Sequence, residues 1–422
     1  MKDTTSYYYY YYYAWVCVCA AILLKLVIIL VPGFHHVSLF EYDDIARNML
    51  LGQGYGIENF HTWYRTFGSP PYSYLCFFIY FVLGYSHFPI LFLQTIFTGI
   101  TALCCFGIGS RLYSPPVGGI AAVLVSFHPG LFYYDITNLH PLSFDAALAA
   151  SSLLMILALR KTQALGVAAL CGFLQGIAVL ERSTFVFLVP LTLLSIWLSR
   201  KQGGFYRRAL FYCLMFSIIP GVWFVRNYLQ YHRAVFVTTT GAEVLWRGNN
   251  PYASGGAYAA GHPGQSVFSA TPKEFQDRIM GQDELVQQDI FSKEAKSFML
   301  HHPRETVKLF FKKLFIFLWF SPQTGFLYPQ IYLTLYKIYY SIMLFFALGG
   351  IFLSPKKKKI RNHQEVWTVL VFMASVAALQ AIFYVDLRHR WGIEPLLLIF
   401  TAEGIFLTMK LFHRFFTDRS AI

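Results

Sequence analysis

Charged residues are scarce in this chain: Asp, Glu, Lys and Arg together make up 13% of its 422 residues. Soluble globular domains carry about 25% charged residues, so the composition argues against a water-soluble fold. Apolar residues take their place, with 56% hydrophobic and 19% aromatic residues and a mean hydropathy of +0.48. Several apolar runs approach the roughly 20 residues that a helix needs to cross a bilayer. The sequence therefore predicts an integral membrane protein.

The cysteine pattern argues against a disulfide-stabilised protein, and the first apolar run argues against a cleaved signal peptide. The seven cysteines all lie in apolar runs, so we interpret them as small buried hydrophobic residues, and no CxxC pair or disulfide framework appears. The first apolar run, Ala14 to Val31, lacks a small-residue cleavage site and is expected to remain as a signal-anchor span. Lys25 interrupts this run and is expected to face other helices rather than lipid.

Ten apolar segments are predicted to cross the membrane, namely residues 14–31, 88–110, 116–135, 141–159, 163–180, 184–199, 209–226, 331–353, 365–386 and 391–411. Two further apolar stretches, 72–86 and 306–320, are expected to lie on the membrane surface. The first is too short to cross, and the second contains three lysines.

The net charge of +13 is concentrated in short clusters between the spans, including the run KKKKIR at 356–361. Ten spans place these clusters and both termini in the cytoplasm, as the positive-inside rule requires. No nucleic-acid-binding module is visible, so we do not assign the clusters to nucleic acid. We expect residence in the bacterial inner membrane, with the opposite, outer face carrying the site.

The chain is interpreted as a single integral membrane domain, 1–422, with two larger outer loops. The first loop, 32–87, contains an acidic helix and a surface helix. The second, 227–330, is predicted to contain a strand or extended piece at 237–246 and a juxtamembrane helix. Within it, Thr271, Pro272 and Glu274 form a capping-box start for a helix that is broken near Gly281 and ends near Leu300.

The stretch SLFEYDDIARNMLLGQGYG, residues 38–56, places three carboxylates within four positions. In a helix that starts near Leu39, Glu41 and Asp44 lie on one face, within about 60° of each other. Asp43 stands four residues before Arg47, the favourable order for an ion pair, so we interpret Asp43 as structural.

Glu41 and Asp44 are therefore candidates for a general base, and Asp44 is slightly favoured because it lies deeper in the helix. The alternative is that acids in a first turn only stabilise the helix dipole. Asp135, at the outer end of a span in LFYYDITNLHP, is the third catalytic candidate; the alternative for it is an ordinary helix-end acid.

Arginines on the same predicted face indicate a phosphate site. Several arginines that converge at a membrane border suit a phosphate held at bilayer depth, which is a lipid phosphate. The alternative is that they snorkel to the interface. The substrate-binding candidates are Arg65, Arg182, Arg247, Asn249, Arg388, His389 and Arg390.

Several segments carry a resemblance to a known family, in the same order along the chain. They include YDDIARNMLLGQGYG, RTFGSPPYSYLCFFIYFVLG, GIAVLERSTFVFLVPL and RHRWGIEPLLLIFTAEG. Together they resemble the glycosyltransferase family 39 group of the GT-C superfamily, related to protein O-mannosyltransferases and lipid A aminoarabinose transferase. The resemblance implies an all-α polytopic membrane protein, a GT-C-like bundle of about ten transmembrane helices with outer juxtamembrane helices and a small extracytoplasmic loop region.

The resemblance also implies an activity: an inverting transfer of a sugar from a polyprenyl-phosphate donor to a lipid, glycan or protein acceptor. Some relatives use a divalent metal and others do not, and no metal ligand is assigned here. Relatives usually carry the key aspartate four residues before the tyrosine matching Tyr42, where this chain has Ser38. A catalytically inactive homologue therefore stays open, as does a transporter or flippase of lipid-linked sugars, although no internal repeat is visible.

Overall fold

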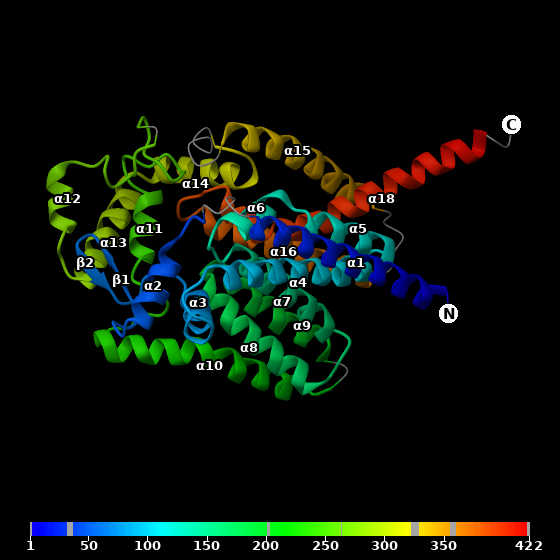
Figure 1. Ribbon diagram of the computed structural model, residues 1–422, viewed down its shortest axis with the longest axis horizontal. Helices are drawn as coiled ribbons and strands as arrows, with labels where there is room; N and C mark the ends of the chain where they lie inside the picture. Colours follow the sequence, from blue (N-terminus) through cyan, green and yellow to red (C-terminus); the bar gives the residue numbers. More distant parts are fainter. Residues whose placement is uncertain are drawn as a thin grey trace.

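The computed structural model describes residues 2–31, 37–200, 203–262, 264–321, 329–354 and 360–419. Long helices pack side by side, with the start of α1 and the end of α18 at one end of the molecule (Figure 1). At the other end, shorter helices and a small hairpin gather into what we term the loop region. The basic run at 356–359 lies outside the described residues.

Helices make up most of every segment that was predicted to cross the membrane. The bundle consists of α1 (Lys2–Leu30), α4 (Phe88–Leu112), α5 (Pro115–Ser126), α6 (Pro129–Thr137), α7 (Leu142–Leu159), α8 (Leu165–Glu181), η1 (Ser183–Phe187), α9 (Leu188–Leu198), α10 (Phe205–Tyr231), α15 (Gln330–Leu353), α16 (Ile360–Gln380) and α18 (Glu394–Arg419). Six helices in the described residues are long and apolar enough to cross a membrane, and α5 with α6 adds a seventh if the pair, bent by 41°, counts as one span. The all-α polytopic fold is confirmed, while the number of ten spans stays a prediction.

Glycines bring the apolar helices of this bundle together. A Cβ atom on Gly172 of α8 would stand 2.2 Å from the backbone oxygen of Tyr212 in α10. A Cβ atom on Gly404 of α18 would stand 1.9 Å from the backbone oxygen of Phe346 in α15. Such close backbone approach is how membrane helices gain packing contacts where lipid is as apolar as the side chains.

The loop region contains α2 (Glu41–Leu50), β1 (Ile57–Asn59), β2 (Thr62–Tyr64), α3 (Pro70–Leu83), α11 (Gly241–Gly248), α12 (Lys273–Ile279), α13 (Glu284–His301), α14 (Pro303–Leu318) and α17 (Arg388–Trp391). β1 and β2 form an antiparallel hairpin that the sequence did not predict. The strand or extended piece predicted at 237–246 is wrong from residue 241 onward, where α11 forms and buries Trp246 against Phe275 and Phe291 of α12 and α13. The two predicted surface stretches are the helices α3 and α14.

The predicted break near Gly281 is confirmed, since its φ of +72° separates α12 from α13. The predicted capping box is wrong by one position. Pro272 is the residue before the first helical turn, and the Thr271 hydroxyl donates back to the Phe268 carbonyl at 2.6 Å.

Glu284, at the start of α13, joins the loop region to the bundle. Its carboxylate accepts from the backbone N–H groups of Arg65 and Thr66, at 2.9 and 3.3 Å. It also accepts from the Tyr231 hydroxyl of α10 at 2.7 Å, and from the hydroxyl of Thr239. A single buried carboxylate therefore fixes the hairpin, the end of α10 and the segment 237–240, which borders the cavity described next.

Candidate active site

A cavity of about 360 Å³ opens where the loop region meets the bundle. Its walls come from α2, the connections between α6 and α7 and between α8 and η1, the segment 237–244, the end of α16 and α17. The polar and charged side chains among its lining residues are Glu41, Tyr42, Ser69, His140, Asp145, Glu181, Arg182, Ser183, Thr184, Thr238, Thr240, Gln380, Tyr384, Arg388 and His389.

Glu41 is the carboxylate that α2 directs into this cavity. It is the first residue of the helix, and its Cγ lies beside Gly68, whose φ of +67° is a conformation that suits glycine. Burial raises the pKa of Glu41, although the positive charges of Arg388 and Arg247 act in the opposite direction. A carboxylate that is partly desolvated and faces arginines is a reasonable proton acceptor near neutral pH.

Asp44, the favoured candidate for a base, does not line the cavity. Its carboxylate accepts from Arg47 at 3.1 Å on a half-exposed surface. The expected Asp43–Arg47 pair is therefore wrong, since Arg47 binds Asp44 instead. Asp43 is structural, as interpreted, but its partners are the hydroxyls of Tyr80 and Tyr85, at 2.5 and 2.9 Å.

Arg182 lies at the junction of α8 and η1 and lines the cavity. One guanidinium nitrogen donates to the Asp145 carboxylate, and another donates to the His389 carbonyl at 3.5 Å. The side chain is held on both sides and is 15% exposed. A guanidinium fixed in this way keeps part of its donor fork facing the cavity.

Arg388 and His389 line the same cavity. The Arg388 guanidinium lies 3.3 Å from the Asp386 carboxylate and 5.6 Å from the centre of the Phe40 ring. The Asp386 backbone N–H donates to Nδ1 of His389 at 3.1 Å. Burial and the charge of Arg182 lower the pKa of His389, so its imidazole is neutral.

Arg247 approaches the cavity from α11 without being among its lining residues. Its guanidinium donates to the Glu243 carboxylate and lies 4.9 Å from the centre of the Tyr384 ring. Burial opposes its charge, but Glu243 and Tyr384 raise the pKa of Arg247, which therefore stays protonated. Its positive charge reaches Glu41.

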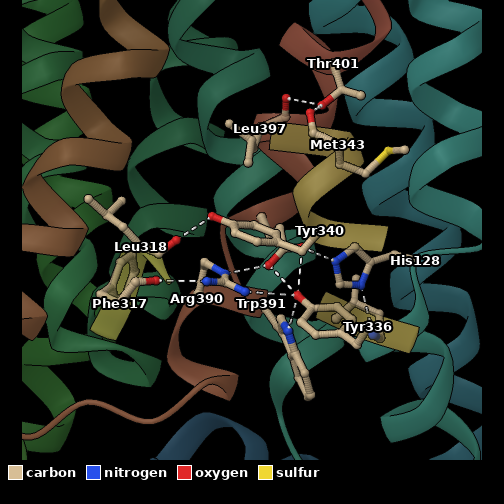
Figure 2. A network of polar contacts seen from close by, with 12 residues as sticks. His128, Phe317, Leu318, Tyr336, Tyr340, Met343, Arg390, Trp391, Leu397 and Thr401 are labelled. Atoms are coloured by element: carbon tan, nitrogen blue, oxygen red, sulfur yellow. Dashed lines mark hydrogen bonds and ion pairs between the residues drawn. The ribbon is translucent and has the colours of Figure 1, made fainter. Parts of the chain in front are cut away.

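Arg390 faces away from the cavity, contrary to its predicted role in substrate binding. Its guanidinium donates to the Glu394 carboxylate at 2.8 Å and to the carbonyls of Phe317 and Trp319, at 3.2 and 3.1 Å. It also lies 3.7 Å from the centre of the Tyr340 ring. Figure 2 shows Arg390 among Phe317, Tyr336 and Tyr340, in a network that joins α14, α15, α17 and, through Glu394, α18. A guanidinium with these partners holds helices together. Arg390 and Arg388 have different surroundings because successive residues of α17 point to different sides.

Three other candidates also lie outside the cavity lining. Arg65 is exposed, and its backbone N–H donates to Glu284 while its backbone carbonyl accepts from Arg226. Asn249 is buried and accepts from the Lys313 ammonium at 3.1 Å. Asp135 is buried among helices, where it accepts from Lys25 at 2.7 Å and Thr98 at 2.6 Å. The prediction that Lys25 faces other helices is confirmed.

Sequence reasoning missed Asp145 and did not assign a role to His140, Glu181 or Thr184, all of which line the cavity. Asp145 stands in the first turn of the apolar α7, and an acid inside a predicted span is itself a signal of function. Burial and the charges of Arg388 and Arg182 lower the pKa of His140, so its imidazole is neutral.

A second, apolar groove of about 400 Å³ lies beside α17, between α6 and α15. Tyr336 and Trp391 line it, and both also belong to the network of Figure 2. The Trp391 indole packs so close to Gly130 of α6 that a Cβ atom there would lie 2.7 Å from the ring. Leu387 and Trp391 face this groove, while Arg388 and His389 face the polar cavity.

Metal coordination has no candidate among the described residues, in which no group of three or more His, Cys, Asp or Glu side chains could hold an ion. The use of a divalent metal therefore stays a prediction from the resemblance. The chemistry that the cavity itself offers is a desolvated carboxylate facing fixed arginines.

Comparison with known proteins bears on this arrangement. Residues 68–223 match the family model described as dolichyl-phosphate-mannose-protein mannosyltransferase. No curated protein sequence matches the chain at a significant level. The family match runs from α3 into α10, where it ends at residue 223, and it includes the walls around Asp145 and Arg182.

Three solved structures are similar to this chain at low sequence identity. An oligosaccharyltransferase from Archaeoglobus fulgidus, in complex with Zn and sulfate, is 15% identical with a TM-score of 0.50 over 94% of this chain and 49% of that one. The archaeal oligosaccharyltransferase AglB from the same organism, in complex with an inhibitory peptide and a dolichol-phosphate, is 11% identical with a TM-score of 0.49 over 97% and 52%. ArnT from Cupriavidus metallidurans, bound to undecaprenyl phosphate, is 13% identical with a TM-score of 0.42 over 92% and 77%.

The chain spans about half of the length of the two oligosaccharyltransferases. At 15% identity, the structure with a TM-score of 0.50 indicates the fold and not the reaction. The resemblance to the GT-C superfamily is confirmed, by the family match over residues 68–223 and by the fold of nearly the whole chain.

Proposed function

We propose that the protein transfers a sugar from a polyprenyl-phosphate donor to a hydroxyl group of a lipid, glycan or protein acceptor, on the membrane face that carries the loop region. The observation that carries this proposal is the placement of Glu41, Arg182 and Arg388 on one cavity at the end of an apolar bundle. The matched family, named for a dolichyl-phosphate-mannose donor, supports the same donor class.

Glu41 is the proposed general base. It takes the proton of the acceptor hydroxyl as the acceptor oxygen attacks the anomeric carbon of the sugar. The bond between that carbon and the phosphate oxygen breaks, its electron pair leaves with the phosphate, and the anomeric configuration inverts. Glu41 replaces Asp44 as the favoured base, because Asp44 is neutralised by Arg47 outside the cavity.

Arg182 and Arg388 are proposed to hold the phosphate and stabilise its charge as it leaves. Both are fixed beforehand, Arg182 by Asp145 and Arg388 by Asp386, so little order is lost when the phosphate binds. The sugar–phosphate thus reacts between two anchored cations and one carboxylate.

The apolar groove beside α17 is proposed to take the polyprenyl chain. Leu387 and Trp391 line the groove and Arg388 lines the cavity, so one short helix separates an apolar wall from a phosphate site. A lipid phosphate presents the same division, with an isoprenoid chain on one side and a charged head on the other.

Ser38 does not contradict activity in this arrangement. Its backbone N–H donates to the Thr137 carbonyl at 2.8 Å, and its own carbonyl accepts from Leu139 at 3.0 Å. The residue therefore attaches the start of α2 to the α6–α7 connection. Glu41, three positions further on, is the carboxylate that reaches the cavity.

Binding of undecaprenyl phosphate to the purified protein tests the proposed phosphate site. Arg182→Ala and Arg388→Ala should each weaken binding by about 10-fold or more, as expected for a lost charge-assisted bond. Arg233→Ala is the matched control, because Arg233 pairs with Asp289 on the exposed surface of the same loop region. Equal affinity in all three variants would refute the site.

A further inference from the structure

Four buried polar atoms of the cavity walls have no hydrogen-bond partner in the described residues: Nδ1 of His140, Oδ1 of Asp145, Oε1 of Glu181 and Oγ1 of Thr184. Asp145, Glu181 and Thr184 are 2%, 6% and 7% exposed. Buried polar atoms are rarely left unpaired in proteins, so a group of them on one cavity points to a ligand.

The two carboxylates are each held by one oxygen and free at the other. Asp145 uses Oδ2 to bind Arg182, and Glu181 uses Oε2 to accept the backbone N–H of Tyr72 at 2.9 Å. Ser69 lies near the Glu181 carboxyl without forming a hydrogen bond to Oε1. Both groups adjoin Arg182, since Glu181 precedes it in the chain and Asp145 accepts from its guanidinium. Their second oxygens are thus fixed in position beside the proposed phosphate site.

A hydroxyl group is the ligand chemistry that suits all four atoms. Carboxylate oxygens accept hydrogen bonds, while a neutral imidazole and a threonine hydroxyl can donate or accept. Hydroxyl groups can also do both. An ammonium group would suit the carboxylates, but it would lie beside Arg182 and could not accept from Thr184. A ligand that carries several hydroxyl groups next to a phosphate is a sugar phosphate.

We propose that Asp145 Oδ1 and Glu181 Oε1, with Thr184 and His140, bind the hydroxyl groups of the donor's sugar. This inference rests on the proposed function and names the subsite that recognises the transferred group. Arg182 connects the two parts, because one of its nitrogens holds Asp145 while the side chain faces the proposed phosphate position.

Glu181→Gln is the clearest test. The amide oxygen can keep the bond to the Tyr72 N–H, while the amide nitrogen replaces Oε1 with a group that can only donate. The affinities of two lipids for the purified full-length protein are compared. The first is undecaprenyl phosphate. The second is an undecaprenyl-phosphate hexose, chosen as the one of the glucose, galactose and mannose forms that binds the parent protein best. Glu181→Gln should weaken binding of the hexose lipid by about 10-fold and change binding of undecaprenyl phosphate less than about twofold.

Thr184→Val provides a second variant that removes one hydroxyl and keeps the shape, and it should give a smaller loss of the same kind. Ser152→Ala is the matched control. Its hydroxyl is also buried and unpaired among the described residues, and it lies on the same helix as Asp145, but it does not line the cavity. It should leave both affinities unchanged.

Three results would overturn the inference. If Glu181→Gln weakens both lipids equally, Glu181 supports the phosphate site or the fold and does not bind the sugar. If neither Glu181→Gln nor Thr184→Val changes hexose-lipid binding, the sugar lies elsewhere. If the parent protein binds neither lipid, the proposed function fails and the subsite fails with it.

Discussion

Replacing Arg390 by alanine should destabilise the protein without removing a cation from the proposed phosphate site. Arg390 is 3% exposed, and its guanidinium donates to the Glu394 carboxylate and to two backbone carbonyls and lies over the Tyr340 ring. Its loss leaves a buried carboxylate with fewer partners, for which about 3–5 kcal/mol of destabilisation is typical. Arg388, two residues away, is 25% exposed and faces the cavity, so its loss should weaken lipid-phosphate binding and leave stability nearly unchanged.

The assay measures two quantities on the same purified variants: the melting temperature and the dissociation constant for undecaprenyl phosphate. Arg390→Ala should lower the melting temperature by several degrees and keep the dissociation constant within about twofold in the folded fraction. Arg390→Met combined with Glu394→Gln should recover part of the stability, since it removes both buried charges together. An Arg390→Ala variant that melts like the parent but loses lipid binding would refute this division between structural and binding arginines.

Three further predictions address the base and the topology. Burial raises the pKa of Glu41, and a general base must be deprotonated to act. The rate of sugar transfer should therefore be retained above that raised pKa and fall as the pH drops through it, with a midpoint above 4.5 in the pH profile of kcat/KM. A midpoint at or below the ordinary pKa of glutamate would contradict the assignment. Asp44→Asn should reduce transfer less than about threefold, since Asp44 pairs with exposed Arg47; a loss of two orders of magnitude would restore Asp44 as the base. A cysteine placed at exposed Ala260 should react with a membrane-impermeant maleimide in intact cells, whereas reaction only after permeabilisation would reverse the topology.

The polytopic bundle could be predicted from the sequence because hydropathy and basic clusters act along the chain and need no tertiary information. The orientation of α2 could not. Helical periodicity placed Glu41 and Asp44 on one arc, but the docking of buried Ile45 and Tyr42 decides which part of that arc meets the cavity. Glu41 lies beside Gly68, and Asp44 reaches the surface.

The same limit applies to the charges around α17. Arg388 and Arg390 look equivalent in the run RHRW, yet a four-residue helix directs one to the cavity and the other to Glu394. Asp145 was missed because a single acid barely lowers the mean hydropathy of an apolar span, and because its partner Arg182 is distant in sequence. The hairpin was missed because its strands are only three residues long.

Acceptor-dependent release of polyprenyl phosphate distinguishes sugar transfer from donor binding alone. It is measured with a panel of polyprenyl-phosphate sugars, and lipid, glycan and peptide acceptors are offered in turn. The parent protein should release the lipid phosphate with one donor, and Glu41→Gln should lower that rate by at least about 100-fold while donor binding is retained. Transfer by Glu41→Gln at the parent rate would contradict the assignment of the base. A parent protein that binds the donor, or moves it across a bilayer, without ever releasing the lipid phosphate would contradict the proposed transfer itself.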